Sequence, residues 1–296
     1  MLASPTYTDL APTLLPAAPP FAPRSPFARL IRLHLCYFWR HRRPLSLDAP
    51  TRFTELIQRR KLTERDARFP RLIDKVAVKA FVAKELGEDW VTPTLWSGEI
   101  LPASPEWPMP FVVKSRHGCN QYRVVRSGRT DWRKIRRAAA DWMRGSYGRW
   151  LDEWGYRSVP RGVMVEPFVG DGTSLPVDYK FYVFHGRVAA VQVHLDRERR
   201  HRWTLLDRTW QRLSSLGCDP GPAAPATLDL MIAGAETLAR GFEFVRVDFY
   251  DTGAIPRFGE MTFYPGSGLD PFDPPALDET LGRLWLQGGT PDSPAH

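Results

Sequence analysis

The chain has 296 residues, of which 43% are hydrophobic and 25% are charged, so it has the composition of a globular protein long enough for one large domain or two modest ones. Its formal net charge is +8, from 41 Lys and Arg against 33 Asp and Glu, which favours an anionic partner such as a nucleotide, an acidic polymer or a membrane surface. The three cysteines are far apart, which excludes a disulfide framework or a cysteine-rich zinc site and indicates a reducing, cytoplasmic location.

The chain begins with a segment rich in Pro, Ala and Thr over residues 1–26, and this composition predicts disorder. Residues 27–43 (FARLIRLHLCYFWRHRR) form a basic amphipathic stretch. It predicts a helix that either makes weak contact with an anionic membrane surface or packs on the domain with its arginines in solvent. The packed helix is favoured, because folded chain follows directly. No apolar run is long enough to span a bilayer, and the first residues lack a signal-peptide pattern.

Hydrophobic periodicity and breaker residues divide the rest of the chain into helices and strands. Helices are expected over residues 51–61, 73–86, 131–150, 227–241 and 276–286, the second with Asp74 as its N-cap and Gly87 as its stop. Strands are expected over residues 91–96, 111–114, 122–125, 162–169, 178–184, 187–195, 242–250 and 256–263. This order predicts an α+β fold in which antiparallel sheets carry helices on their faces.

Residues 242–263 are expected to form a hairpin that brings two carboxylates together. Asp248 lies in the first strand and Glu260 in the second, each among apolar neighbours, and residues 251–253 supply the turn. A buried carboxylate is usually paired or bound to a metal. Two convergent oxygen ligands suit Mg²⁺ when substrate phosphates complete its coordination. The alternative is an ordinary hairpin whose acidic side chains face solvent.

A second candidate site begins at Phe-Val-Val-Lys114, a predicted strand that runs into the loop Ser115–Gln121 with His117 and Gly118. A strand-end lysine followed by the backbone N–H groups of a glycine-containing loop suits a phosphate group. The Walker A sequence is absent, and an exposed strand-end lysine is the commoner structure. His117 is a candidate ligand within this loop.

Two further strands carry candidate ligand-binding residues. Glu166-Pro-Phe168 leads into a turn that contains Asp171, and such a segment can hold a purine through its backbone with a carboxylate on the ribose. A strand with an exposed glutamate is the alternative. Asp178 and Lys180 lie on one face of the next strand, either as a surface ion pair or with the lysine beside a transferring phosphoryl group.

Other functions are disfavoured because their sequence patterns are missing. His117, His185 and His194 lack the spacing of a metal-binding triad, and there is no G-x-S-x-G nucleophile motif. The arginines are spread through the chain without an RNP, helix-turn-helix or zinc-finger pattern. No nucleic-acid partner is therefore expected.

Taken in order, these segments resemble the ATP-grasp enzymes, and among them the TupA-like family, which is named for teichuronopeptide synthesis. The resemblance spans roughly residues 53–286. Its most specific segments are Arg246-Val-Asp248-Phe-Tyr and Gly259-Glu260-Met-Thr262-Phe-Tyr-Pro-Gly-Ser-Gly268. The other matching segments are Asp74-Lys75, Phe-Val-Val-Lys114 with His117-Gly118, Val165-Glu166-Pro-Phe, and Asp178-Tyr-Lys180-Phe-Tyr-Val-Phe-His-Gly.

The resemblance implies that ATP lies between two α+β subdomains, each built on an antiparallel sheet. The residues implied for the nucleotide are Lys75 and Lys114 at the α- and β-phosphates, His117 and Gly118 in a lid loop over the γ-phosphate, Glu166 and Phe168 at the adenine, and Asp171 at the ribose. The residues implied for the chemistry are Asp248, Glu260 and Thr262 for Mg²⁺, Lys180 with Asp178 at the transferring phosphate, and Pro265, Gly266, Ser267 and Gly268 at the acceptor substrate.

Two positions depart from the family pattern. Thr262 stands where many ATP-grasp ligases have an asparagine two residues after the metal-binding glutamate, which bears on the binding of a second metal ion. Cys119-Asn120 stands where the TupA-like pattern usually has Ser-Gly after His-Gly, which predicts a stiffer lid loop.

The predicted organisation is an N-terminal helical segment over residues 27–70, an ATP-grasp domain over 71–288 with a nucleotide lid over about 110–165, and a loose tail over 289–296. The resemblance implies an ATP-dependent carboxylate–amine ligase that acts through an acyl phosphate on a surface-polysaccharide precursor. The alternatives are a polysaccharide-directed transferase or kinase with the same ATP site, and a non-catalytic nucleotide-binding module.

Overall fold

The computed structural model describes residues 25–145, 147–170, 172–215 and 220–288. The predicted disordered start (except Ser25 and Pro26), the predicted tail over 289–296 and Asp171 therefore lie outside the described residues. Two antiparallel sheets organise the chain, which confirms the α+β prediction. The first has the order β1-β4-β2-β3 and the second the order β7-β6-β5-β8-β9.

The bounds of the strands and helices follow the sequence pattern closely in the second half of the chain. The strands are β1 (Trp96–Gly98), β2 (Phe111–Ser115), β3 (Tyr122–Val125), β4 (Val163–Pro167), β5 (Asp178–Phe184), β6 (Arg187–Leu195), β7 (Arg202–Asp207), β8 (Phe244–Tyr250) and β9 (Arg257–Thr262). The α-helices are α1 (Pro26–His41), α2 (Phe53–Thr63), α3 (Phe69–Ile73), α4 (Val78–Leu86), α5 (Trp132–Arg144), α6 (Leu228–Leu238) and α7 (Ala276–Leu286).

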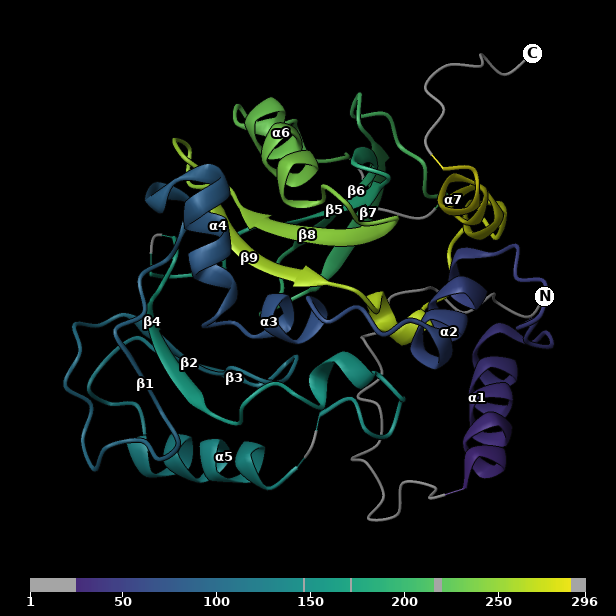
Figure 1. The fold of residues 1–296 in the computed structure, drawn as a ribbon. Coiled ribbons are helices and arrows are strands. Elements are labelled where there is room, and N and C mark those ends of the chain that lie inside the picture. Colours follow the sequence, from purple (N-terminus) through teal and green to yellow (C-terminus); the bar gives the residue numbers. More distant parts are fainter. Residues whose placement is uncertain (1–24, 146, 171, 216–219, 289–296) are drawn as a thin grey trace, which may run out of the picture.

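The two sheets lie between two covering helices, with α6 on the outer side of the second sheet and α5 on the outer side of the first (Figure 1). In the first sheet, Phe111 and Val113 of β2 share a buried cluster with Ile135 and Trp142 of α5. Because side chains alternate along a strand, Lys114 must lie on the opposite face. The inner faces of the two sheets are thus left to form a site between them.

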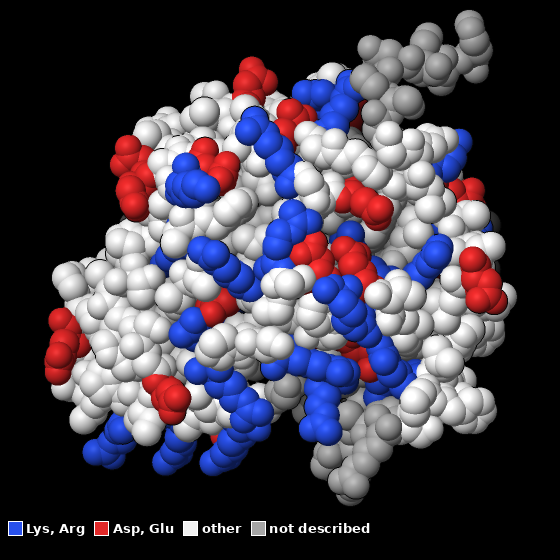
Figure 2. All heavy atoms as spheres, in the orientation of Figure 1, with Lys and Arg blue, Asp and Glu red and all other residues white. Residues whose placement is uncertain are grey.

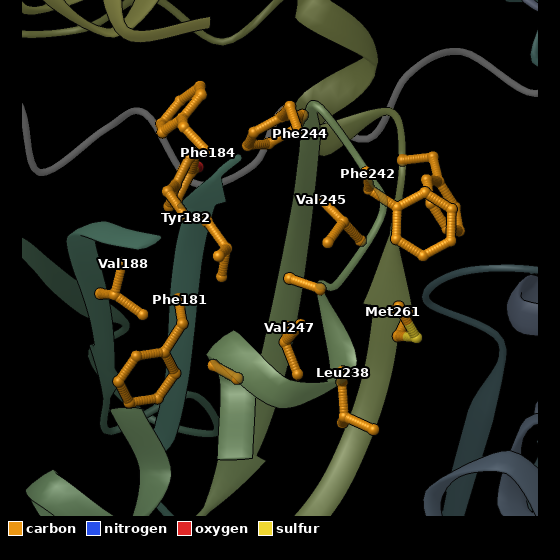
Figure 3. Close-up of a cluster of buried hydrophobic side chains, with 14 of the residues drawn as sticks. Phe181, Tyr182, Phe184, Val188, Leu238, Phe242, Phe244, Val245, Val247 and Met261 are labelled. Carbon is orange, nitrogen blue, oxygen red and sulfur yellow. The ribbon is translucent and has the colours of Figure 1, made fainter. Parts of the chain in front are cut away.

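The outer face of the second sheet forms the main apolar core with α6. Figure 3 shows Phe181, Val245 and Val247 of the central strands close to Leu238 of α6. The inner face changes character along its length. At one end its side chains are aromatic and pack on Phe53 of α2. At the other end they are charged, and these charged side chains form the site described below.

Several predicted elements differ from the structure. The helix expected over 73–86 begins later, since α4 starts at Val78, and Asp74 ends the preceding helix α3. Its Oδ1 atom still accepts hydrogen bonds from the N–H groups of Val76 and Ala77, at 3.0 and 3.4 Å, so it caps the turn that leads into α4. The strand expected over 91–96 is wrong, since β1 begins at Trp96; Pro93 cannot donate a backbone hydrogen bond there.

Two further differences concern burial and length. The helix expected over 131–150 ends at Arg144, where Gly145 stops it. β8, expected to be half-buried because polar residues alternate along it, is buried on both faces up to Phe249. Its polar side chains face the inner site rather than solvent.

Residues 27–70 share the main core with the rest of the chain, since Phe53, Ile57 and Phe69 belong to it. A charged residue accompanies them. Lys61 of α2 is fully buried, and its Nζ atom donates hydrogen bonds to the carbonyl and hydroxyl oxygens of Ser267, both at 2.6 Å, and to Gln58 Oε1 at 3.0 Å. Burial, only partly offset by the charge of Glu153, lowers the pKa of Lys61 to about 8.

Replacing this ammonium group should weaken the fold. Lys61→Met keeps the side-chain length but removes the donor to Gln58 Oε1 and to both Ser267 oxygens, of which the carbonyl oxygen keeps its bond from Gln58 Nε2 at 2.9 Å. The change should lower the free energy of unfolding by about 1–3 kcal/mol. The matched control is Lys84→Met on the exposed face of α4, where 81% of the side chain is exposed and the change should stay within about 0.5 kcal/mol. Urea denaturation measures both, and equal stability of the two variants would contradict the prediction.

Candidate active site

A cavity of about 160 Å³ lies between the inner faces of the two sheets. Most of the residues predicted for a nucleotide and its chemistry meet on its walls: Lys75, Lys114, Gly118, Phe168, Asp178, Lys180, Asp248 and Glu260. Figure 2 shows basic side chains across the middle of the molecule with a small group of acidic side chains among them. The cavity therefore combines cationic and anionic groups in one place.

The predicted convergence of the two carboxylates is confirmed. β8 and β9 pair in antiparallel register with Asp248 opposite Glu260. Residues directly opposite each other in such a pair point to the same face, so both carboxylates face the cavity. The ladder shifts by one residue just beyond Asp248, and Gly259 lies against that strand, where a Cβ atom would come within 3.0 Å of the Asp248 carbonyl oxygen.

Lys180 lies between two carboxylates at the centre of the site. Its Nζ atom donates to Asp178 Oδ2 at 2.7 Å and to Asp248 Oδ2 at 2.6 Å. Burial opposes the charge of this ammonium group, but the two carboxylates outweigh burial and raise the pKa of Lys180 above its ordinary value. The site therefore holds a permanent cation at neutral pH, buried among anions.

Arg246 is a site residue for which the sequence analysis gave no role. It contacts Asp248 through two hydrogen bonds of 2.7 Å, and its second guanidinium nitrogen also reaches Glu260 Oε1 and Thr262 Oγ1, both at 3.1 Å. Its position two residues before Asp248 was the signal for this role, because residues i and i+2 of a strand share a face. Arg246 thus fixes the orientation of both carboxylates.

The donor set fits a divalent cation. Glu260 Oε2 faces the site, 4.0 Å from the Lys75 ammonium group, and the buried Asp178 Oδ1 has no hydrogen-bond partner among the residues that the structure describes. Within the described residues there is no group of three or more metal-ligating side chains, so ligand phosphates would have to complete the coordination. Thr262 does not line the cavity. It donates a hydrogen bond to Glu260 Oε1 at 3.1 Å and so supports that carboxylate.

The two predicted phosphate lysines approach from the other side of the cavity. Lys75 donates to the carbonyl oxygen of Gly118, which ties it to the lid loop. Lys114 pairs with Glu166, and Lys79 contacts the other oxygen of the same carboxylate at 2.6 Å. Burial opposes the charge of Lys114, yet Glu166 outweighs burial and raises the pKa of Lys114. Glu166 therefore positions two lysines and does not itself line the cavity.

Removing Lys114 should weaken nucleotide binding. Lys114→Ala should cost about 1.5–3 kcal/mol of binding free energy for a nonhydrolysable ATP analogue, the usual value of a charge-assisted hydrogen bond. The matched control is Lys134→Ala on α5, where 81% of the side chain is exposed. Titration calorimetry compares the two variants, and equal losses of affinity would refute the assignment.

Of the remaining residues predicted for the nucleotide, Phe168 lines the cavity and His117 does not. Phe168 lines the cavity together with Pro167 and Val169, which gives an apolar wall at the end of β4. His117 does not line it. Its Nε2 atom lies 3.1 Å from the carbonyl oxygen of Trp142, and its Nδ1 atom accepts from the N–H group of Gly162 at 3.3 Å. The predicted role of His117 as a ligand is therefore replaced by a structural one.

A second cavity of about 160 Å³ adjoins the first and contains part of the predicted acceptor loop. Pro265, Gly266 and Gly268 line it, whereas the Ser267 side chain turns away to Lys61. Gly268 has a φ angle of +66°, and a Cβ atom there would lie 2.8 Å from Ile57. The glycine is thus required by contact with α2, which sets the position of the loop.

The other walls of the second cavity are formed by residues to which the sequence pattern assigned no role in the site. They include Arg40 of α1, Tyr182 of β5, His194 of β6, Trp203 of β7 and Arg246 of β8. The His194 and His201 rings are stacked, with nitrogens 2.8 Å apart, and burial lowers the pKa of His194. Lys180 lines both cavities, so the two share a wall at this residue.

A known protein family and several solved structures match this chain. A family model described as TupA-like ATPgrasp matches residues 55–286. Similar solved structures include D-alanine–D-alanine ligase from Bacillus anthracis complexed with ATP, at 13% identity over 66% of this chain and 55% of that one with a TM-score of 0.40. ATP-grasp ligase PsnB, complexed with a phosphomimetic variant of its minimal precursor, Mg and ADP, is 12% identical over 79% and 66% of the chains with a TM-score of 0.42.

D-alanine–D-alanine ligase from Helicobacter pylori is 15% identical over 85% of this chain and 72% of that one, with a TM-score of 0.42. This chain spans only 55% of the length of the Bacillus anthracis ligase and 66% of the length of PsnB. No curated protein matches the chain.

Proposed function

The chain belongs to the TupA-like ATP-grasp family, and from this premise we propose that it is an ATP-dependent ligase that joins a carboxylate to an amine through an acyl phosphate. The observation that carries the proposal is the position of Lys180, which lies where the two cavities meet. In this proposal the cavity between the sheets binds ATP. The cavity at the 265–268 loop binds the acceptor carboxylate.

The walls of the first cavity support this assignment. Its apolar side at Phe168 suits the adenine ring, and Lys75 and Lys114 are placed for the phosphates. Asp248 and Glu260 would hold Mg²⁺ with the phosphate oxygens. Bound there, the ion would neutralise charge on the β- and γ-phosphates.

The proposed reaction follows from placing two substrates on either side of Lys180. A carboxylate oxygen of the acceptor attacks the γ-phosphorus of ATP, and the bond from that phosphorus to the β–γ bridging oxygen breaks to release ADP. An amine nitrogen then attacks the acyl carbon, loses a proton to solvent and displaces inorganic phosphate, which leaves an amide. Lys180 offers a fixed positive charge to the transferring phosphoryl group, while Arg246 keeps Asp248 oriented.

The second cavity suits an anionic acceptor. Arg40, Lys180 and Arg246 contribute three positive charges to its walls, against one carboxylate from Asp270. Tyr182 and Trp203 add ring surfaces. Together with the family description, these features support a precursor of a surface polysaccharide or peptidyl polymer as the acceptor. We place the reaction in the cytoplasm, in keeping with the free thiols of Cys36 and Cys119.

Hydroxylamine separates this reaction from that of a kinase. An acyl phosphate is an electrophile that an added amine intercepts, whereas a phosphate ester is not. With ATP, Mg²⁺ and a pool of candidate carboxylates, the protein should give a hydroxamate together with free phosphate. ADP formation with phosphate retained on the acceptor and no hydroxamate would favour the kinase.

A further inference from the structure

Helix α1 packs on the protein with its charged side inward. Arg29 and Arg32 both pair with Asp152, the first at 3.0 Å, and Arg32 stacks over Trp150 with 4.8 Å between the guanidinium carbon and the ring centre. Arg40 donates a hydrogen bond to the carbonyl oxygen of Leu269 at 3.0 Å. The inward side thus carries arginines as well as the buried Leu33 and Tyr37, whereas the charged side of an ordinary surface helix faces water.

The outward side of α1 is consequently apolar. Six large side chains along it remain between 39% and 72% exposed: Phe27, Leu30, Ile31, Leu35, Phe38 and Trp39. Single exposed apolar residues are common on proteins, but a contiguous group of this size marks an interaction surface. We propose that this side of α1 docks on an anionic lipid bilayer.

The charge around the helix favours a bilayer over other partners. Residues 26–41 contain no Asp or Glu, and the exposed residues next to the apolar side include His34 and Arg42. Asp48 is the acidic residue that borders the neighbouring groove. α5 carries four net positive charges, from five Arg and Lys against Asp141, and Figure 2 shows them along the lower edge of the molecule, beside a largely uncharged surface over α1.

An interfacial helix inserts its apolar side into the headgroup region, and basic neighbours attract anionic lipids. No helix in the described part of the chain is long and apolar enough to cross a membrane, so this contact would be peripheral. Arg40 on the same helix lines the acceptor cavity. If the proposed function is correct, docking would bring that cavity about one helix diameter, roughly 10 Å, from the lipid surface, where a lipid-borne acceptor could reach it.

Cosedimentation of the full chain with vesicles tests the proposal. The protein should bind vesicles of phosphatidylcholine mixed with phosphatidylglycerol, bind less at high salt, and bind little to phosphatidylcholine alone. Leu35→Glu/Phe38→Glu should reduce binding by about tenfold or more, because the apolar contact is lost. The matched control is Leu230→Glu/Leu286→Glu, which changes net charge equally at exposed leucines of α6 and α7 and should change binding by less than about twofold.

Three outcomes would overturn the proposal. The first is that the wild-type protein does not bind vesicles. The second is that both double variants lose vesicle binding equally. The third is that the wild-type protein forms a dimer which only the α1 variant disrupts, while vesicle binding is unchanged. The last would show that a second copy covers α1. Circular dichroism confirms that the variants are folded. The cosedimentation mixture contains no nucleotide, so vesicle binding does not depend on the ligase activity. The hydroxamate experiment tests that activity separately.

Discussion

Glu260→Gln should leave the protein folded and reduce ATP turnover by about a hundredfold to a thousandfold, the usual effect of removing one charged or polar group that acts on the transition state. The amide oxygen can still accept from Arg246 and Thr262, as Glu260 Oε1 does at 3.1 Å. What is lost is the negative charge that, in the proposed site, would face the phosphates and their metal ion. Burial opposes this charge, but Lys75 and Arg246 outweigh burial and lower the pKa of Glu260, so the carboxylate is ionised at neutral pH.

The control for this variant is Glu279→Gln, which removes a carboxylate paired with Arg52 on the exposed side of α7. Release of ADP in the presence of Mg²⁺ gives the rate, and circular dichroism checks the fold. Turnover at the wild-type rate in a folded Glu260→Gln protein would remove Glu260 from the site.

Lys180→Met should reduce product formation by about a hundredfold or more, with a smaller effect on the affinity for an ATP analogue. The reason is that, in the proposed reaction, charge develops beside Lys180, which lines both cavities, while Lys75 and Lys114 would contact the rest of the nucleotide. Separate measurement of kcat and of analogue binding distinguishes the two effects. A loss confined to nucleotide affinity would place Lys180 among the phosphate-binding residues instead.

The pH dependence of this lysine has a definite sign. Because Asp178 and Asp248 raise the pKa of Lys180 above its ordinary value of 10.5, its contribution to stability is fully present below that pH and is lost only as the pH rises through the higher folded-state value. The ammonium group also keeps its charge over this range. The wild-type rate should therefore show no loss from deprotonation of Lys180 between neutral pH and about pH 10. A rate that falls with a titration near pH 8 would require another group, or an environment for Lys180 different from the one described.

The sequence predicted the hairpin over 242–263 well because the signal for two strands and a turn is local. The exact pairing was less predictable, because Asp248 comes opposite Glu260 only through the one-residue shift of the ladder beside Asp248. The same alternation that identified β5 put Asp178 and Lys180 on one face. Alternation alone could not show that the face of β5 with Asp178 and Lys180 is buried. The first sheet lies across the cavity from that face, and no pattern within a strand of the second sheet indicates this.

Partners distant in sequence could not be predicted. The Glu166 side chain pairs with Lys79 and Lys114, and His117 bonds to the main chain of Trp142 and Gly162; neither partnership leaves a local pattern. The second cavity is likewise assembled from α1, α2, the 265–268 loop and four strands of the second sheet.

The most direct test of the central claim follows one oxygen atom. The candidate carboxylates are labelled with ¹⁸O in both carboxyl oxygens and incubated with the protein, ATP, Mg²⁺ and an amine or hydroxylamine. If the carboxylate attacks the γ-phosphorus, the released inorganic phosphate must carry one ¹⁸O atom, which mass spectrometry detects. Phosphate without ¹⁸O, released while an amide or hydroxamate forms, would contradict the acyl-phosphate mechanism.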